Sequence, residues 1–388
     1  MNRRQFLTHS TVGLSAIPFA ACSTKLLRGE TVGSPVVKNI IPEFQLQVPA
    51  LMSELRVAGV SIALIQDAKV VWLGSFGYRD ADTKLPVDKN TVFQAASMSK
   101  PVFAYAVLKL CEAHVIDLDT PLTQYTRDRF LANDPRLESI TPRHVLSHSS
   151  GFQDWRSSDD PLKIHFNPGS EYLYSGEGYY YLQSVVTHLI GHTDTTDCAR
   201  FEAGLEVCAS DIDQFLIKHV LAPFGMRLSG YATTSKLRRH LATGHDGQGK
   251  PFRKTTSKVS ERPAITRYAS SGALLTTSND YAEFVLEILN PKASDAFHLT
   301  QDTLNEMLRP KIKVAYHGFS SSWGLGWQIQ DNGLFNHGGD NQGFHCHAIA
   351  SRTSKSGFVI MTNSESGALL IQRLFGSGIL KRFFPQNN

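Results

Sequence analysis

Strand-like segments at both ends of this chain enclose a long middle that is rich in helical patterns. Near the start, Gly59–Gln66 and Lys69–Phe76 are joined by two residues, which is typical of a β-hairpin. Similar strand-like runs return near the end of the chain, at 323–331, 343–351 and 357–363. An isolated hairpin is marginally stable in water, so strands from the two ends must pair. We therefore expect one sheet, built from both ends, around an inserted helical part.

The first 22 residues have the pattern of an export signal. Arg3 and Arg4 precede an apolar run over residues 12–21, which is too short to cross a bilayer and is typical of a signal sequence. Paired arginines here predict bacterial export by the twin-arginine route. The tetrapeptide Phe-Ala-Ala-Cys that ends at Cys22 resembles a lipobox, although leucine usually occupies its first position. We expect a periplasmic protein anchored to the membrane through a lipid on Cys22; the alternative is a cleaved signal with an incidental cysteine.

The net charge argues against a nucleic-acid partner, and the histidine spacing argues against a zinc site. The full chain carries a net charge of +4, and removing residues 1–21 removes two arginines and no acid, which leaves +2. We therefore expect no nucleic-acid partner. His144 and His148 have an i, i+4 spacing that suits zinc, but no glutamate completes an H-E-x-x-H motif. We expect no metal and no cofactor.

Ser97 and Lys100 form an S-x-x-K tetrad directly ahead of a helical apolar pattern. Val102, Ala106 and Leu110 belong to that pattern, so the tetrad stands at the start of a buried helix, where both side chains share one face. A buried lysine with a lowered pKa can take the proton of a serine hydroxyl, and the helix N-terminus presents backbone N–H groups to an oxyanion. The tetrad alone recurs by chance, so a solvated lysine at an ordinary helix start is the alternative.

Tyr174 is a second candidate, in the segment Tyr174-Ser175-Gly176. It follows a Pro-Gly turn on an extended stretch and precedes the helical run Tyr179–Leu189. A tyrosine whose pKa is lowered can act as a general base toward a serine. Because the stretch is rich in tyrosine, a core tyrosine is the alternative.

His337, Gly338 and Gly339 lie in a third segment, residues 335–344, which we expect to connect two strands. Adjacent glycines let a substrate or another backbone approach closely. A histidine that is packed between strands is the alternative to a functional His337.

With these three motifs in this order, the sequence resembles the serine β-lactamase and penicillin-binding protein superfamily, nearest its class C β-lactamase and family VIII carboxylesterase branch. The resemblance runs from about residue 40 to about 380 and includes signatures at 141–151 and 269–280. It implies an α+β fold, in which an antiparallel β-sheet is flanked by helices and an all-α domain is inserted. It also implies a site in the cleft between the two parts.

The resemblance implies a role for each motif residue. Ser97 would be the nucleophile, and Lys100 with Tyr174 would be one coupled proton-transfer unit. The backbone N–H groups of Ser97 and Asp340 would form the oxyanion hole. His337 would orient the substrate or supply a proton or positive charge, beside Gly338 and Gly339.

Gly176 departs from the superfamily pattern, in which an asparagine amide at this position binds the acylamide side chain of β-lactams. Glycine offers no such contact, and a site without a polar partner loses discrimination for that group. We therefore expect an exported serine hydrolase that acts on carboxylic esters or small amides. The alternatives are a β-lactamase or D-Ala-type peptidase, and a penicillin sensor or scaffold without turnover. All of these take a small ester, amide or β-lactam as their ligand.

Cys198 and Cys208 lie in a polar stretch that interrupts two helical runs, Tyr179–Ile190 and Ile212–Leu221. A disulfide between them is compatible with an oxidising periplasm, and two free surface cysteines are the alternative.

The expected organisation has three parts. Residues 1–22 are the signal and 23–40 are a tether. Residues 41–383 are the catalytic domain, with an α/β part at 41–110 and 290–383 and a mostly helical part at about 111–289. We expect helices around Phe44–Leu55 and from about Ser366 to Phe383.

Overall fold

The structure is a computed structural model that describes residues 34–126, 130–131, 133–190, 198–200, 206–252, 268–316 and 319–384. The expected signal, the lipidation site Cys22 and most of the expected tether therefore lie outside the described residues. Within the described residues, no helix is both long and apolar enough to cross a membrane.

A nine-stranded antiparallel sheet joins the two ends of the chain. Its strand order is β3-β2-β1-β13-β12-β11-β10-β9-β8. The strands are β1 (Gly59–Gln66), β2 (Lys69–Asp80), β3 (Leu85–Pro86), β8 (Ile312–Tyr316), β9 (Phe319–Trp323), β10 (Gln328–Gln330), β11 (Phe335–Asn341), β12 (Phe344–Ser351) and β13 (Ser356–Thr362). The N-terminal β1 pairs with the C-terminal β13, with Ile62 opposite Ile360. The predicted α+β fold with an antiparallel sheet is confirmed.

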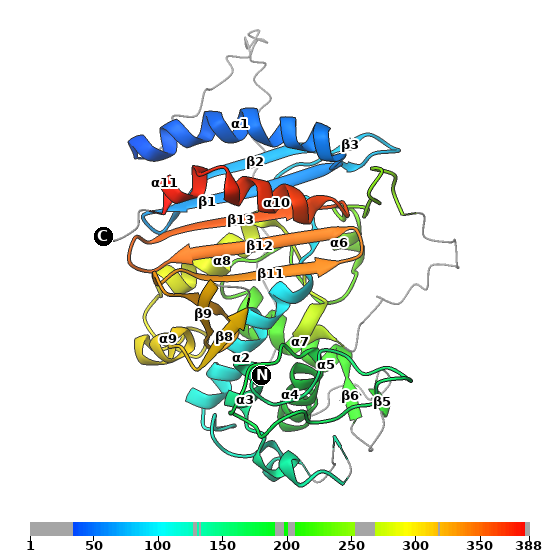
Figure 1. The fold of residues 1–388 in the computed structure, drawn as a ribbon, viewed down its shortest axis with the longest axis vertical. Helices are drawn as coiled ribbons and strands as arrows, with labels where there is room; N and C mark the ends of the chain where they lie inside the picture. Colours follow the sequence, from blue (N-terminus) through cyan, green and yellow to red (C-terminus); the bar gives the residue numbers. More distant parts are fainter. Residues whose placement is uncertain are drawn as a thin grey trace, which may run out of the picture. The chain divides into compact units, whose positions relative to one another are not determined.

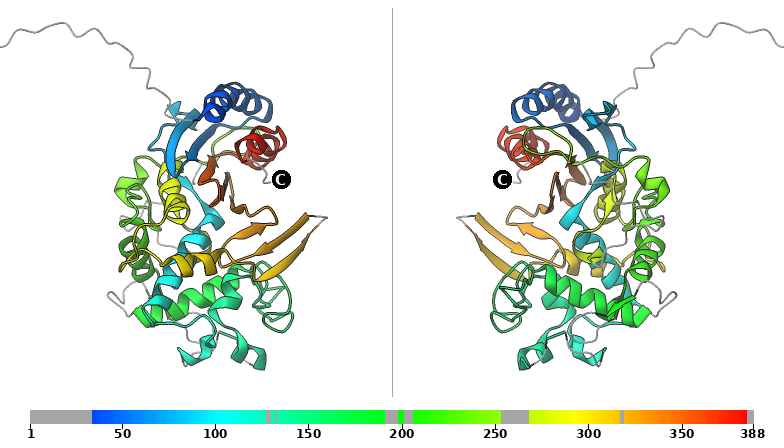
Figure 2. Two further views of the ribbon diagram at one scale, coloured as in Figure 1. Left: turned by 90° about the vertical axis from the view of Figure 1, so that its left-hand side faces the viewer. Right: turned by 90° about the vertical axis from the view of Figure 1, so that its right-hand side faces the viewer.

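Helices cover both faces of this sheet, which explains why β1 is buried along nearly its whole length and does not alternate between buried and exposed residues. Along β1, Ile62 and Leu64 face one hydrophobic cluster, whereas Ala63 and Ile65 face another. The first cluster also contains residues of three helices, α1 (Pro35–Leu55), α10 (Gly367–Gly376) and α11 (Ile379–Phe383). The second contains residues of α2 (Ser99–Glu112) and α8 (Ser278–Leu289). Figures 1 and 2 show α1, α10 and α11 on one side of the sheet and α2 and α8 on the other.

The middle of the chain is mainly helix and loop and packs around α2. Its helices are α3 (Pro142–Leu146), α4 (Gly176–Ile190), α5 (Ala209–Leu216), α6 (Ser235–Arg238) and α7 (Ala269–Gly272), followed later by α9 (Gln301–Leu308). Short 3-10 and π turns lie at Ala96–Met98, Leu122–Gln124, Pro135–Ser139 and Ile217–Leu221. Two small antiparallel pairs complete it, β4 (Phe93–Gln94) with β7 (Leu275–Thr276) and β5 (Cys198–Arg200) with β6 (Glu206–Cys208). The second hydrophobic cluster runs without a break from the sheet through α2 into α4.

Several elements differ from the sequence prediction. The expected strand at 323–331 is divided between the last residue of β9 and strand β10, and neither β8 nor the pair of β5 and β6 was expected. Helix α1 begins at Pro35, so residues 35–40 belong to this helix and not to the tether. The segment that was expected to connect two strands is itself strand β11, which pairs with β12 along its whole length. The C-terminal helix is divided into α10 and α11 because Gly378 adopts a left-handed backbone between them.

The two cysteines of the predicted disulfide lie opposite each other. Cys198 in β5 is the register partner of Cys208 in β6. Their side chains lie outside what the structure describes, so the disulfide stays a prediction.

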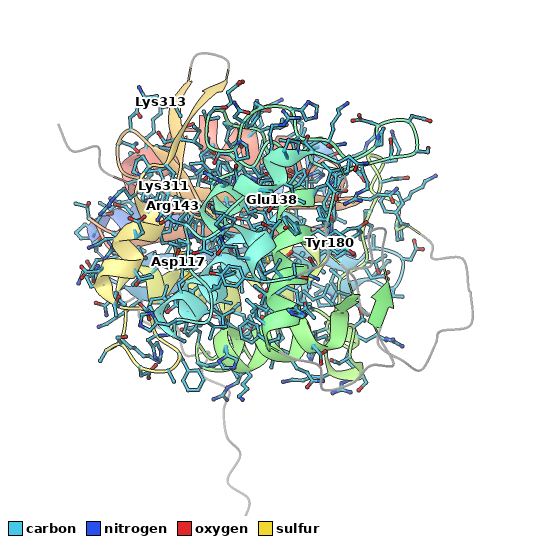
Figure 3. The ribbon with its side chains drawn as sticks, turned by 90° about the horizontal axis from the view of Figure 1, so that it is seen from below. Asp117, Glu138, Arg143, Tyr180, Lys311 and Lys313 are labelled. Atoms are coloured by element: carbon cyan, nitrogen blue, oxygen red, sulfur yellow. The ribbon has the colours of Figure 1, made fainter. Side chains whose placement is uncertain are left out.

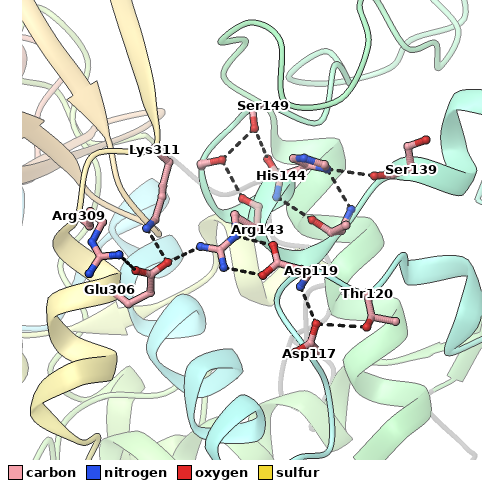
Figure 4. A network of polar contacts seen from close by, with 12 residues as sticks. Asp117, Asp119, Thr120, Ser139, Arg143, His144, Ser149, Glu306, Arg309 and Lys311 are labelled. Carbon is pink, nitrogen blue, oxygen red and sulfur yellow. Dashed lines mark hydrogen bonds and ion pairs between the residues drawn. The ribbon is translucent and has the colours of Figure 1, made fainter.

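Arg143 on α3 joins the helical part to the C-terminal part of the chain (Figures 3 and 4). Its guanidinium contacts both carboxylate oxygens of Asp119, at 2.6 and 2.7 Å, and also contacts Glu306 on α9. Glu306 in turn accepts a hydrogen bond of 2.6 Å from Lys311, which lies just before β8. Bidentate arginine–carboxylate contacts have a fixed geometry, so this network holds α3 in place against α9. The loop that follows α3 carries residues of the candidate site.

Candidate active site

Ser97 lies on a strained turn directly before α2. The turn spans Ala96–Met98, and α2 begins at Ser99. Ala96 has a φ of 48°, a left-handed conformation that costs an alanine about 1–2 kcal/mol. Ser99 holds the turn, because its hydroxyl donates to the carbonyl of Ala96 at 2.6 Å and accepts from the N–H of Leu274 at 2.9 Å. The partly exposed Ser97 is thereby presented at the end of a buried helix.

Lys100 is the immediate partner of Ser97. Its Nζ lies 3.0 Å from the Ser97 Oγ and donates to the carbonyl of Ser271 on α7 at 2.8 Å. The side chain is buried, and burial lowers the pKa of Lys100 to about 7, while the negative charge of Asp154 opposes this shift. About half of the lysine is therefore a neutral amine at neutral pH, which is the form that can accept a proton.

Tyr174 completes the group around the nucleophile. Its hydroxyl forms a hydrogen bond with Ser97, and the Lys100 Nζ lies 4.7 Å from the centre of its ring. Burial raises the pKa of Tyr174 above its usual 10, although the bond to Ser97 lowers it. This is the opposite of the lowered pKa that a tyrosine base requires, so the hydroxyl is protonated at neutral pH.

His148 fixes the segment that carries Tyr174. Its carbonyl accepts the N–H of Leu173 at 2.9 Å, and its Nδ1 accepts the N–H of Ser175 at 3.0 Å. The imidazole is fully buried and packs against the tyrosine ring with a centroid separation of 4.3 Å. His148 thus holds both chain neighbours of Tyr174, a positioning role that the sequence did not reveal.

Strand β11 forms the opposite wall. Strand β10 pairs with β11 only at Phe335 and Asn336, so in the described residues the edge of β11 beyond Asn336 is open toward Ser97. A Cβ at Gly339 would overlap the carbonyl oxygen of Ala95, so glycine is needed for this close approach. The backbone of Gly338 and Asp340 therefore lies beside the nucleophile, where backbone N–H groups can meet an oxyanion.

His337 is buried within this wall. Its Nδ1 lies 2.6 Å from the carbonyl oxygen of Gly338, and its Nε2 has no hydrogen-bond partner among the described residues. Burial, followed by the nearby Lys100, lowers the pKa of His337 to about 3. The imidazole is neutral at neutral pH, so His337 does not supply a positive charge to the site.

Trp155 fills the space next to Gly176. A Cβ at position 176 would overlap the indole ring of Trp155, which in turn packs against Tyr268 with a centroid separation of 4.9 Å. The N–H of Gly176 donates to the carboxylate of Asp154 at 2.8 Å. The aromatic ring of Trp155 and the carboxylate of Asp154 therefore both lie next to Gly176.

Several of these residues line a pocket of about 340 Å³. Its lining residues are Ser97, Asp154, Trp155, Tyr174, Ser271, Gly272, Trp323, Gln328, His337, Gly338, Asp340 and Asn341. Among the described residues, no group of three or more His, Cys, Asp or Glu side chains is placed to hold a metal ion.

The structure brings most of the predicted site residues together. Ser97, Tyr174, His337, Gly338 and Asp340 line the pocket, and Lys100, Gly176 and Gly339 lie directly behind it. The sequence patterns did not indicate Asp154, because its place at the site depends on loops that meet only in the folded chain. Ser271 lies within the 269–280 signature, but the contact of its carbonyl with Lys100 was not predicted.

Comparisons with known proteins agree with this fold. The family model described as Beta-lactamase matches residues 44–373. A curated relative, Protein flp of Staphylococcus aureus strain MW2, is 21% identical over 330 residues, which cover 80% of this chain and 60% of that protein. The chain thus spans about 60% of the length of that relative.

Two solved structures have the same fold. The octameric penicillin-binding protein homologue from Pyrococcus abyssi superposes with a TM-score of 0.68 at 20% identity, covering 88% of this chain and 79% of that one. A class C beta-lactamase superposes with a TM-score of 0.67 at 17% identity, covering 89% and 98%. The resemblance to the serine β-lactamase and penicillin-binding protein superfamily is confirmed, and the chain belongs to the β-lactamase family.

Proposed function

We propose that this protein is a serine hydrolase that forms an acyl-enzyme on Ser97 and hydrolyses carboxylic esters or small amides. The observation that carries the proposal is the contact of 3.0 Å between the Ser97 Oγ and a buried Lys100 whose pKa is about 7. A serine hydroxyl needs a neighbouring base, and a neutral amine at hydrogen-bond distance is one.

The proposed acylation starts with neutral Lys100 as base. Lys100 takes the hydroxyl proton while the Ser97 Oγ attacks the substrate carbonyl carbon. The negative charge that develops on the carbonyl oxygen is met by the backbone N–H groups of Ser97 and Asp340. When the tetrahedral intermediate collapses, the proton on Lys100 passes to the leaving oxygen or nitrogen, directly or through the Tyr174 hydroxyl.

The proposed deacylation repeats this sequence with water. Lys100, neutral again, takes a proton from the attacking water, and the proton returns to the Ser97 Oγ as the acid leaves. Tyr174 acts in this scheme as a protonated relay, in accordance with its raised pKa. The neutral His337 contributes position and no charge.

Simple acyl groups suit this pocket better than acylamide side chains. A side chain at position 176 would meet the Trp155 ring, so no amide can point into the pocket from there. Binding and discrimination of an acylamide depend on such a polar partner. Esters and small amides require only the carbonyl contacts and an apolar wall.

The test is hydrolysis of p-nitrophenyl acyl esters of several chain lengths beside a chromogenic cephalosporin, with wild type and Ser97→Ala. We expect ester turnover that disappears in Ser97→Ala and slow cephalosporin turnover. Rapid cephalosporin turnover would contradict the proposal and show that the protein is a β-lactamase. A stoichiometric burst without turnover would identify a sensor, and activity that survives in Ser97→Ala would refute the mechanism.

We also infer, from the sequence alone, export by the twin-arginine route and a lipid on Cys22. The support is the pair Arg3 and Arg4 followed by a short apolar run that ends in a lipobox-like tetrapeptide. Replacing both arginines by lysine should retain the protein in the cytoplasm. The mass of the mature N-terminal peptide would show a lipid on Cys22, and an unmodified cysteine there would contradict the anchor.

A further inference from the structure

The charged groups at the pocket surface are all of one sign. Among its described lining residues, only Asp154 and Asp340 have carboxyl groups and none is a lysine or arginine, and the Asp340 carboxylate already contacts the imidazole of His345 at 2.5 Å. The nearest amine, Lys100, lies behind Ser97 and does not line the pocket. A carboxylate on a substrate would therefore meet the negative charge of Asp154 and find no lining cation to pair with.

Asp154 is placed to receive a ligand. One carboxylate oxygen, Oδ1, accepts the N–H of Gly176 at 2.8 Å. Among the described residues, no other hydrogen bond to this carboxylate is present, so its second oxygen is available. The side chain is exposed at the pocket, and a bound substrate would cover it. A charge that becomes covered in this way needs an opposite charge.

Aromatic faces stand beside this carboxylate. Trp155 follows Asp154 directly and is 42% exposed, and Trp323 and Tyr174 line the same pocket. The rings of Trp323 and Tyr174 lie 5.9 Å apart and nearly perpendicular to each other. Aromatic faces attract ammonium groups through the ring quadrupole, most strongly in the case of tryptophan.

We infer that this pocket selects ester or amide substrates that carry a positive charge, such as an ammonium group on the acyl chain, and disfavours substrates with a carboxylate. The inference rests on the proposed function and names its substrate class. Asp154 pairs with the cation, and Trp155 and Trp323 supply aromatic faces.

The test uses three p-nitrophenyl esters of matched shape. The 4-(trimethylammonio)butanoyl ester is cationic, the 5,5-dimethylhexanoyl ester is its neutral isostere, and the 4-sulfobutanoyl ester is anionic. We expect kcat/KM of the wild type to be about tenfold higher for the cationic ester than for the neutral one, and lowest for the anionic one. Added salt should reduce the preference for the cation.

The variant Asp154→Asn tests whether Asp154 causes the preference for the cationic ester. Asparagine keeps an oxygen that can accept the N–H of Gly176, so the loop is retained while the charge is lost. We expect the ratio of kcat/KM for the cationic and neutral esters to fall about tenfold. The matched control is Asp159→Asn, because Asp159 is an exposed aspartate of the same loop that does not line the pocket. It should leave the ratio unchanged.

The outcomes separate the two proposals. If Ser97-dependent turnover is found and the neutral or anionic ester is preferred, the charge inference is wrong and the hydrolase proposal stands. A cation preference that survives in Asp154→Asn would overturn the assignment of Asp154. If none of the three esters gives Ser97-dependent turnover, the proposed function itself fails.

Discussion

Replacing Lys100 by methionine should stabilise the folded protein at low pH while it removes activity. Burial moves the pKa of Lys100 from its usual 10.5 to about 7. At about 1.36 kcal/mol per pKa unit, holding the protonated lysine in the fold costs about 5 kcal/mol. Methionine has a similar length and no charge, but it leaves the carbonyl of Ser271 without its partner, at a cost of about 1–3 kcal/mol. We expect a net gain of about 2 kcal/mol or more in the free energy of unfolding at pH 6.

The pH dependence of this gain has a definite sign. Below pH 7 the folded and unfolded chains both hold the proton on Lys100, so the wild type bears the whole cost. Between about pH 7 and pH 10.5 the unfolded chain holds a proton that the folded chain lacks, and wild-type stability rises with pH. From pH 6 to pH 9 the difference between the variant and the wild type should therefore shrink by about 3 kcal/mol.

Urea unfolding at pH 6, 7.5 and 9 measures this difference. Lys69→Met is the control, because Lys69 is exposed on β2 and its replacement removes the same charge from the surface. Its effect on the free energy of unfolding should change little over this range. A Lys100→Met difference that stays constant or grows from pH 6 to pH 9 would show that Lys100 is not a buried amine with a lowered pKa.

Three further predictions concern the same site and its support. Gly339→Ala would push β11 away from Ala95 and should lower kcat about 100-fold or more with the fold retained, whereas Gly376→Ala, which meets no neighbour, should change neither kcat nor Tm appreciably. The wild-type kcat/KM should rise with pH through a midpoint of about 7, because neutral Lys100 is the base; a flat profile from pH 6 to 8 would count against this assignment. Arg143→Ala should lower the free energy of unfolding in urea by about 1–2 kcal/mol through loss of its partly exposed carboxylate contacts, and an unchanged midpoint would show that the network contributes little.

Local patterns were sufficient for the elements that local contacts determine. The hairpin of β1 and β2 and the helix α2 were predicted because apolar periodicity and a short connection specify them within a few residues. The pairing of the chain ends was predicted because strands at each end need partners. The contact between Ser97 and Lys100 was also predictable from local sequence, because a spacing of three residues within one turn brings their side chains together.

Strand β11 was missed for the opposite reason. Its sequence, Phe-Asn-His-Gly-Gly-Asp-Asn, is poor in the β-branched and aromatic residues that favour strands. It is extended because β12 pairs with it throughout and because the turn before α2 packs against Gly339. Tertiary contacts thus override a weak local preference, and Gly339 allows the close backbone approach that the adjacent glycines predicted.

The pocket wall at Gly176 shows what one sequence can and cannot predict. The missing amide was evident from the motif alone. The aromatic ring that occupies the space beside Gly176 was not evident from the motif. Trp155 belongs to a loop 21 positions earlier in the sequence, and this loop meets Gly176 only in the folded chain. The same holds for His148, whose contacts with the neighbours of Tyr174 span about 25 residues of chain.

The unfavourable features of this fold are concentrated around the nucleophile. Ala96 adopts a left-handed backbone, Lys100 is a buried amine, and the Nε2 of His337 is buried without a partner among the described residues. Each of these costs free energy that the large continuous core must offset. Their proximity is difficult to explain by stability, because an ordinary residue at each position would fold better. A site that accepts such costs at adjacent positions is one in which reactivity at Ser97 depends on them, and for that reason the variant that removes Lys100 should gain stability as it loses activity.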